Sequence, residues 1–157
     1  MNYKLDSRIE LRGRLDSLNA EIICVQANSD DENYIADLEE IRGVIRTLQR
    51  CEAANESFTG KLTLWELNED EIHSQSHNPL GTRRHIMPHY SMGIKAAEIN
   101  RLRTLVRECE LCSCRVFDGD SLRINHVLNR LSSALYVLIY KYLPADYDKF
   151  IEFAVKK

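Results

Sequence analysis

Apolar residues recur every three or four positions over long stretches of this sequence, and this spacing constrains the fold more than any other feature. The first such stretch contains Leu11, Leu15, Leu18, Ile22 and Val25. A period of about 3.6 residues is that of an α-helix with one apolar face. Gly and Pro are scarce, at 6 and 3 residues, and no segment sustains the alternation typical of a half-buried strand. The sequence therefore predicts an all-α protein.

The longest amphipathic stretches are expected to form long helices joined by polar turns. They cover about residues 7–26, 34–53, 94–117 and 122–142. The segments NSDDEN and DGDS, which separate the first pair and the last pair, are rich in residues that favour turns. This pattern predicts an up-and-down helical bundle that forms a single domain over residues 1–157.

Local signals refine the helix ends and the connections. Asp6 is placed to cap the first helix, and Asn68, with a Glu three residues later, resembles a capping box that opens a short fifth helix. Residues 76–93 contain two prolines and two glycines, so we expect them to be largely irregular. Pro144 ends the last long helix, and a further short helix is expected after Asp146.

Charge and composition exclude several classes of function. A net charge of −3 gives no overall attraction to nucleic acid or to an anionic membrane. The longest apolar run, residues 134–139, is far shorter than the roughly 20 residues that a membrane span needs. Five cysteines are an odd number, and the N-terminal segment does not resemble a signal peptide. We therefore expect free thiols and a cytoplasmic location.

Three cysteines near position 110 raise the question of a metal cluster. They are Cys109, Cys112 and Cys114, within a predicted helix. At about 100° per residue, Cys114 points roughly 140° away from Cys109, whereas Cys112 shares the apolar side with Cys109. Three thiolates divided in this way cannot bind one ion without unwinding the helix. The pattern favours structural cysteines.

Two histidine pairs also have a spacing of four residues. They are His73 with His77, and His85 with His89. This spacing brings two imidazoles together only within a helix, and the prolines and glycines of residues 76–93 argue against a continuous one. No metal site is predicted.

Polar residues line a second side of three predicted helices. They are Arg12, Asp16 and Asn19; Arg103, Arg107 and Glu110; and Asn125, Asn129, Ser132 and Tyr136. One interpretation is plain solvated surface, with the arginines and Glu110 forming ion pairs worth about 0.2–0.5 kcal/mol each. The other is a site between helices or subunits, because Asn and Ser are poor helix formers and their recurrence on several helices is unusual.

Three segments resemble the PduO-type corrinoid adenosyltransferases. Residues 6–22 contain a D-x-L-N pattern that includes Asp16 and Asn19. Residues 102–111 (LRTLVRECEL) are similar to that family's Arg-Thr-x-x-Arg-Arg-Ala-Glu-Arg helix, and residues 127–138 (VLNRLSSALYVL) to its Tyr-Leu-Asn-Arg-Leu-Ser-Asp stretch. Two further segments are LNEDEIHSQSHNPLG (67–81) and HIMPHYSMG (85–93). Taken together, the five segments and their order along the chain are still more similar to the ethanolamine-utilisation branch of the family, the EutT-type enzymes.

The resemblance implies transfer of the 5′-deoxyadenosyl group of ATP to the Co(I) of reduced cobalamin, with Mg²⁺ as cofactor, giving adenosylcobalamin and triphosphate. It implies a homo-oligomeric bundle, commonly a trimer, with nucleotide sites between subunits. A cobalamin reductase and ethanolamine ammonia-lyase would be its partners, in the cytoplasm or in a bacterial microcompartment. The alternatives are a non-catalytic corrinoid carrier or assembly protein with the same bundle, and a helical interaction module.

The resemblance also implies roles for individual residues. Arg107 would contact the phosphates and stabilise the charge of the transition state, with Arg103 one turn earlier. Guanidinium groups suit this role because a triphosphate leaving group needs several directed donors. Glu110 would orient the arginines or help to hold Mg²⁺ through its carboxylate.

Further nucleotide contacts are implied elsewhere in the chain. Asp16 would reach from a second subunit to hold the phosphate-binding arginine, and Asn19 shares its motif. Asn129 would bind the nucleotide, with Arg130 beside it. The Thr-Gly-Asp-rich phosphate segment of PduO-type chains and the His/Cys motif of many EutT-type chains have no counterpart in this sequence. Lys4 is a candidate substitute cation.

The corrinoid side is expected to be apolar and poor in water, so that the lower axial ligand stays off and Co(II) is easier to reduce. Candidate wall residues are His85, Met87, Tyr90 and Met92. In the PduO pattern a Phe stands at the position of His85.

Overall fold

Five α-helices account for most of the chain in the computed structural model, which describes residues 3–152 and, of these, all side chains except those of residues 3–5 and 80. They are α1 (Tyr3–Ala27), α2 (Glu32–Ala54), α3 (Glu69–His77), α4 (Gly93–Val116) and α5 (Ile124–Tyr142). Short 3₁₀ turns are η1 (Pro79–Gly81), η2 (Tyr90–Met92) and η3 (Asp118–Asp120). The predicted all-α fold with about five helices is confirmed.

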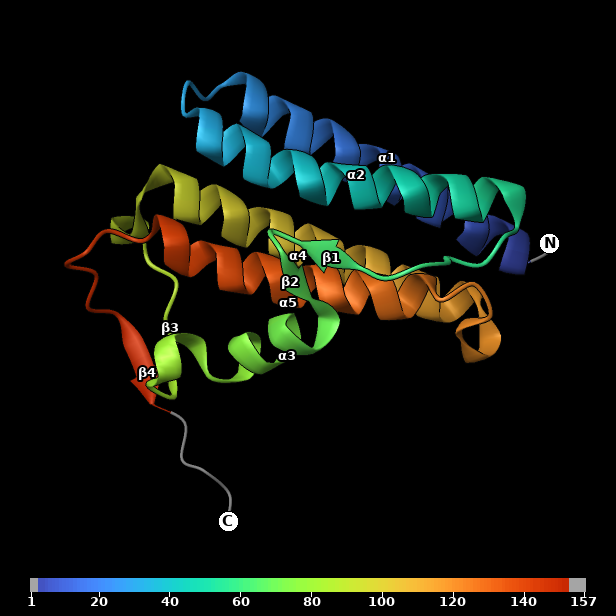
Figure 1. Cartoon of the computed structure of the whole chain (residues 1–157). Helices are drawn as coiled ribbons and strands as arrows, with labels where there is room; N and C mark the ends of the chain where they lie inside the picture. Colours follow the sequence, from blue (N-terminus) through green and yellow to red (C-terminus); the bar gives the residue numbers. More distant parts are fainter. Residues whose placement is uncertain (1–2, 153–157) are drawn as a thin grey trace, which may run out of the picture.

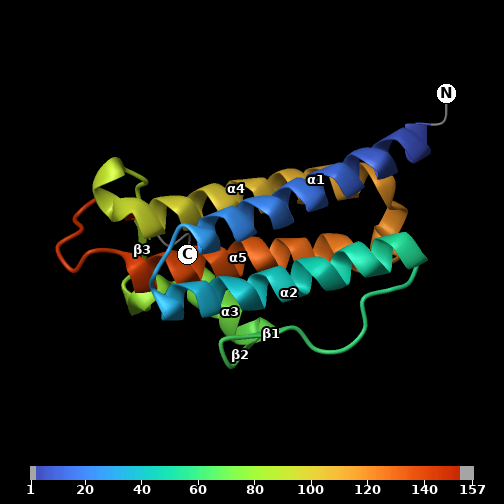
Figure 2. The ribbon, with the colours of Figure 1, turned by 90° about the horizontal axis from the view of Figure 1, so that it is seen from above.

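The four long helices form an antiparallel bundle. α1 and α2 make one hairpin, α4 and α5 make a second, and the two hairpins pack on each other (Figures 1 and 2). α3 lies along the outer side of α5, away from α1 and α2 (Figure 1). No helix of residues 3–152 has the length and apolarity needed to cross a membrane.

The core lies between the long helices and is built from the apolar faces that the helical spacing predicted. On α1 these are Leu11, Leu15, Leu18, Ile22 and Val25, all buried. On α5 they are Ile124, Val127, Leu128, Leu131, Leu135 and Leu138, also buried. Burying these faces fixes the rotation of each helix, and with it the direction of the polar side chains.

The start of α3 agrees with the prediction from the sequence, whereas the starts of α1 and α2 differ from it. Asn68 and Glu71 form the predicted capping box of α3, with Glu71 N donating to Asn68 Oδ1 at 2.9 Å. α1 begins at Tyr3, so Asp6 lies in its first turn and is not its cap. α2 begins at Glu32, two residues earlier than predicted, because Asp31 accepts hydrogen bonds from the backbone at its start.

Two small antiparallel ribbons interrupt the connections. They are β1 (Thr63–Leu64) with β2 (Leu67–Asn68), and β3 (Arg84–Ile86) with β4 (Phe150–Glu152). The expectation of a helix after Asp146 is wrong within the described residues, which end in strand β4. That strand depends on pairing with β3 and on the Arg84 guanidinium, 4.2 Å from the ring centre of Phe150. The residues that neighbour β4 in the sequence therefore gave no indication of the strand, because its partners lie far away along the chain.

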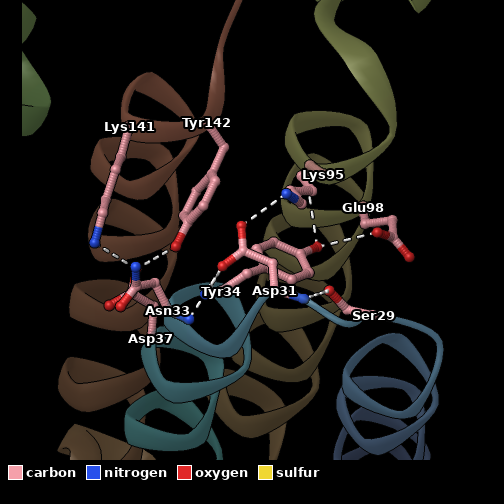
Figure 3. A network of polar contacts seen from close by, with 9 residues as sticks. All are labelled: Ser29, Asp31, Asn33, Tyr34, Asp37, Lys95, Glu98, Lys141 and Tyr142. Carbon is pink, nitrogen blue, oxygen red and sulfur yellow. Dashed lines mark hydrogen bonds and ion pairs between the residues drawn. The ribbon is translucent and has the colours of Figure 1, made fainter.

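Polar contacts join α2 to the ends of α4 and α5 (Figure 3). Asp31 pairs with Lys95 at 2.7 Å. Asp37 is nearly buried and accepts from Lys141 Nζ at 2.7 Å and from the Tyr142 hydroxyl at 2.6 Å. These charge-assisted hydrogen bonds fix the register of the two hairpins at this end of the bundle.

The cysteines divide as the helical geometry predicted. Cys109 and Cys112 are buried on the core side of α4, and Cys114 is exposed. Burial, and next the neighbouring Cys112, raise the pKa of the Cys109 thiol to about 12. No group of three or more His, Cys, Asp or Glu side chains suited to a metal ion occurs among the described residues.

This division predicts which thiols react in the native protein. At about pH 8, Cys24 and Cys114 should react with an aromatic disulfide reagent, because they are exposed and their thiolates are accessible. Cys51, Cys109 and Cys112 should react only after unfolding in urea. Mass spectrometry of the labelled peptides assigns each site, and labelling of Cys109 in the native protein as fast as Cys24 would contradict the prediction.

Candidate functional site

α3, α4 and α5 together line an open polar pocket of about 280 Å³. Its lining residues are His73, Ser76, His77, Arg103, Arg107, Asn129, Ser132, Ser133 and Tyr136. None of these lining residues is acidic, whereas two carry a guanidinium group and two carry an imidazole. The pocket therefore offers cationic and hydrogen-bonding groups to an anion.

Core packing presents these side chains to the pocket. On α4, Arg103 and Arg107 lie one turn apart, and their neighbours Leu102 and Val106 are fully buried. On α5, Asn129 lies next to the fully buried Leu128. The polar stripes of α4 and α5 therefore face the same space, as the interpretation of a site between helices predicted.

The two arginines of α4 that line the pocket have no carboxylate partner among the described residues. Arg103 is partly buried, and its Nε and Nη2 donate to Asn100 Oδ1 at 3.2 and 3.1 Å. Arg107 is exposed and has no hydrogen-bonding partner within residues 3–152. Burial, and next the charge of Arg107, lower the pKa of Arg103 from its ordinary value. Two neighbouring cations left unpaired in this way favour a bound anion.

Glu110 contacts Asn129 instead of the arginines. Asn129 Nδ2 donates to Glu110 Oε1 at 3.1 Å, which joins α5 to α4 beside the pocket. Within the described part of the chain, the ion-pair ladder of Arg103, Arg107 and Glu110 does not form. Glu110 thus orients Asn129, a lining residue.

Arg130 contacts α3, and no carboxylate of residues 3–152 pairs with it. Its Nη1 lies 2.6 Å from His73 Nδ1, and its Nε is buried without a hydrogen-bond partner. The rings of His73 and His77 are 4.4 Å apart, on successive turns of α3. As expected, no continuous helix joins the two histidine pairs, because α3 ends at His77. The first pair nevertheless lies within α3, whereas His85 lies in β3 and His89 precedes η2.

Tyr136 links the pocket to strand β3. Its hydroxyl is 2.9 Å from His85 Nδ1 and 3.0 Å from the hydroxyl of Tyr140. The Tyr140 hydroxyl accepts from Ile86 N at 2.9 Å and donates to Arg84 O at 3.1 Å. Two tyrosines of α5 thus hold β3 beside the pocket.

The four candidate corrinoid residues have different environments. His85 is partly buried against Tyr136. Met87 and Tyr90 are 43% and 88% exposed, so both can contact a ligand. Met92 is 2% exposed and belongs to the hydrophobic core, which corrects its assignment as a wall residue: its side chain packs inside the bundle.

The candidates on α1 lie apart from the pocket lining. Asp16 is exposed, and Asn19 is partly buried with its Oδ1 unpartnered. Ile9 and Ile23, each seven residues from Asp16 along α1, are 57% and 45% exposed. An acidic side chain between two exposed isoleucines is therefore available to a neighbouring molecule. The side chain of Lys4 lies outside the described residues.

Sequence reasoning missed the α3 wall of the pocket. His73, Ser76 and His77 are spaced three and four residues apart, which places them on one helical face. That spacing was a usable signal, but only the packing of α3 on α5 shows that the face meets Arg103 and Arg107.

A family comparison and a comparison with individual proteins both point to the cobalamin adenosyltransferases. The sequence profile of the cobalamin adenosyltransferase family matches residues 1–142. The chain is 36% identical over 146 residues to the corrinoid adenosyltransferase EutT of Salmonella typhimurium, which covers 88% of this chain and 54% of that protein. It is 34% identical over 148 residues to the corrinoid adenosyltransferase EutT of Escherichia coli K12, with the same two coverages. The chain spans about half the length of these curated relatives.

Proposed function

Because this chain belongs to the cobalamin adenosyltransferase family, we propose that it is an ATP:cob(I)alamin adenosyltransferase. In this reaction the electron pair of Co(I) forms the bond to C5′ of ATP. The bond between C5′ and its oxygen breaks, and triphosphate leaves with the electron pair of that broken bond. The observation that carries the proposal is the pocket in which Arg103 and Arg107 have no carboxylate partner within the described part of the chain.

The pocket suits the charge that develops in this reaction. Negative charge grows on the triphosphate as the bond to C5′ breaks, and preorganised guanidinium donors stabilise it. Asn129, held by Glu110, supplies an amide for the nucleotide. Mg²⁺ would be held by phosphate oxygens together with the Glu110 carboxylate, an oxygen ligand of the type that this ion prefers, and would neutralise phosphate charge.

The corrinoid would bind beside strand β3. Tyr136 lines the nucleotide pocket and contacts His85, so the two substrates would meet near this pair of rings. The exposed side chains of Met87 and Tyr90 would form part of an apolar wall. Ethanolamine ammonia-lyase would use the product, and a cobalamin reductase would supply the reduced substrate.

The complete site would lie between subunits, in a trimer. Within residues 3–152, Asp16 has no hydrogen-bond or ion-pair partner, and the exposed Ile9 and Ile23 on the same side of α1 suit burial against another subunit. Arg107, which has no partner among the residues that the structure describes, carries the complementary charge. Asp16 of one subunit would hold Arg107 of the next.

This arrangement predicts complementation between two inactive variants. Asp16→Ala and Arg107→Ala should each have little activity, whereas mixed oligomers from co-expression should recover activity in about a quarter of their sites, by random assembly around a closed ring. A mixture of Arg103→Ala and Arg107→Ala is the control and should stay inactive, because both residues belong to one chain. Failure of the first mixture to exceed the control would place the site within a single subunit.

The function is tested by adding ATP, Mg²⁺ and chemically reduced cobalamin to the purified chain. Formation of the adenosylcobalamin spectrum, with release of triphosphate or its hydrolysis products, is expected. Corrinoid binding without adenosylcobalamin formation would instead indicate the non-catalytic carrier, and binding of neither substrate would indicate an interaction module.

A further inference from the structure

His73 contacts a guanidinium group on one side and lines the anion pocket with the same ring. Its Nδ1 lies 2.6 Å from Arg130 Nη1, and its side chain shares the pocket with Arg103 and Arg107. Within the described residues, Nε2 of this ring has no hydrogen-bond partner. The contact therefore leaves one ring nitrogen of His73 available to a ligand.

The chemistry of the contact determines the tautomer. A guanidinium group donates hydrogen bonds and cannot accept them, and it stays protonated in proteins. Nδ1 of His73 must therefore be the acceptor, so the single proton of the neutral ring is on Nε2. The free nitrogen is consequently an N–H donor.

From this contact we infer that His73 is a neutral hydrogen-bond donor to a phosphate oxygen of the bound polyphosphate, and that Arg130 is the positioning residue that fixes its tautomer. The inference rests on the proposed function for the identity of the anion. α3 then forms the third wall of the phosphate pocket, opposite the cations of α4. The sequence analysis assigned neither His73 nor the short helix α3 a role in nucleotide binding.

The charges around His73 explain why a neutral donor suits this position. Burial, and next the charge of Arg130, lower the pKa of His73, and the neighbouring His77 acts in the same direction. Asp70, one turn earlier on α3, opposes them. Across the pocket, the guanidinium groups of α4 add further positive charge. A donor without charge binds phosphate without adding to this repulsion.

The same contact argues against a metal ion on the His73–His77 pair, despite its favourable helical spacing. A histidine that binds a metal through one nitrogen usually donates the proton of the other to a carbonyl or carboxylate. Here the second nitrogen of His73 faces a donor, so ligation through Nε2 would place two N–H groups against each other.

Binding of inorganic tripolyphosphate, measured by calorimetry, tests the inference. His73→Leu should raise the Kd about tenfold or more, the usual effect of losing a hydrogen bond to a charged group. His73→Gln should restore most of the affinity, because its Oε1 can accept from Arg130 while its Nε2 donates. His89→Leu, an exposed histidine outside the pocket, is the matched control and should bind as the unmodified chain does.

Imidazole ¹⁵N NMR supplies a readout that a purely structural role would not change. The Nε2–H tautomer is expected for His73. Arg130→Met should raise the pKa of His73, so that tripolyphosphate affinity increases as the pH falls from about 8 to about 6, the range in which a free imidazole gains its proton. In the unmodified chain the affinity should increase less over the same range, because desolvation and the charge of Arg130 lower the pKa of His73.

Several results would overturn the inference. They are an Nδ1–H tautomer, equal tripolyphosphate affinity of the unmodified chain and His73→Leu, or Zn²⁺ binding that His73→Leu abolishes. If His73→Leu lowers the melting temperature measured by circular dichroism, the test passes to a second variant. In that case, a folded His73→Gln variant that binds tripolyphosphate as weakly as His73→Leu would overturn the inference. A chain that binds tripolyphosphate through His73 but forms no adenosylcobalamin would contradict the proposed function alone.

Discussion

Replacing Arg107 with alanine is expected to lower kcat/KM for adenosyl transfer by about 10²–10³-fold, the usual effect of removing one preorganised donor from a developing anion. The guanidinium lines the pocket and has no partner among the described residues, so no contact seen in the subunit depends on it. Its loss should therefore act on the reaction and not on folding of the subunit. Formation of adenosylcobalamin, followed by its absorbance, measures the effect.

Two further variants make this expectation specific. Arg101→Ala removes another exposed arginine of α4, which pairs with Glu21 at 3.4 Å and does not line the pocket, and should keep nearly full activity. Arg107→Lys retains the charge but loses the forked donor geometry, so it should recover only part of the rate. Equal activity of Arg107→Ala and Arg101→Ala would show that the pocket is not the phosphate site.

Replacing Glu52 with alanine is expected to lower the free energy of unfolding by about 3 kcal/mol, as for the loss of one partner of a buried ion pair. The Glu52 side chain is almost fully buried at the end of α2. Its two oxygens accept from Arg8 Nε at 2.6 Å and from Arg12 Nε at 2.7 Å, which joins α2 to α1. Without the carboxylate, both guanidinium groups would lose their anionic partner at the helix interface.

Urea unfolding followed by circular dichroism measures this change. Glu10→Ala is the control, because Glu10 is 41% exposed and pairs with Arg14 on the surface of the bundle. Surface pairs of this kind contribute about 0–1 kcal/mol, so its effect should be much smaller. A Glu52→Ala variant as stable as Glu10→Ala would mean that packing alone holds α1 against α2.

Local features of the chain were enough to predict the helices. Apolar spacing, turn residues and the capping box at Asn68 act over a few neighbouring positions, and the structure has helices close to the expected bounds. The exceptions involve distant partners. Strand β4 forms only because β3 pairs with it, so residues 150–152 have no local signal that distinguishes a strand from a helix.

Part of the candidate site could also be found from the sequence, although its functional roles remain predictions. Arg103 and Arg107 share a helical stripe, as do Asn129 and Tyr136, and the structure brings both stripes to one pocket. The burial of Met92 was not predictable, because its position in an irregular segment leaves no helical period to show which way it points.

The sequence by itself determined which residues form helices and which face of each helix is apolar, because both depend on backbone geometry within a turn or two. Only the tertiary structure decided that α3 packs on α5 and brings His73 to Arg130. It also decided that Tyr136 contacts His85 and that Glu110 binds Asn129 instead of the arginines. Such contacts join positions far apart in the chain, and they follow from how apolar faces pack together, which no local pattern specifies.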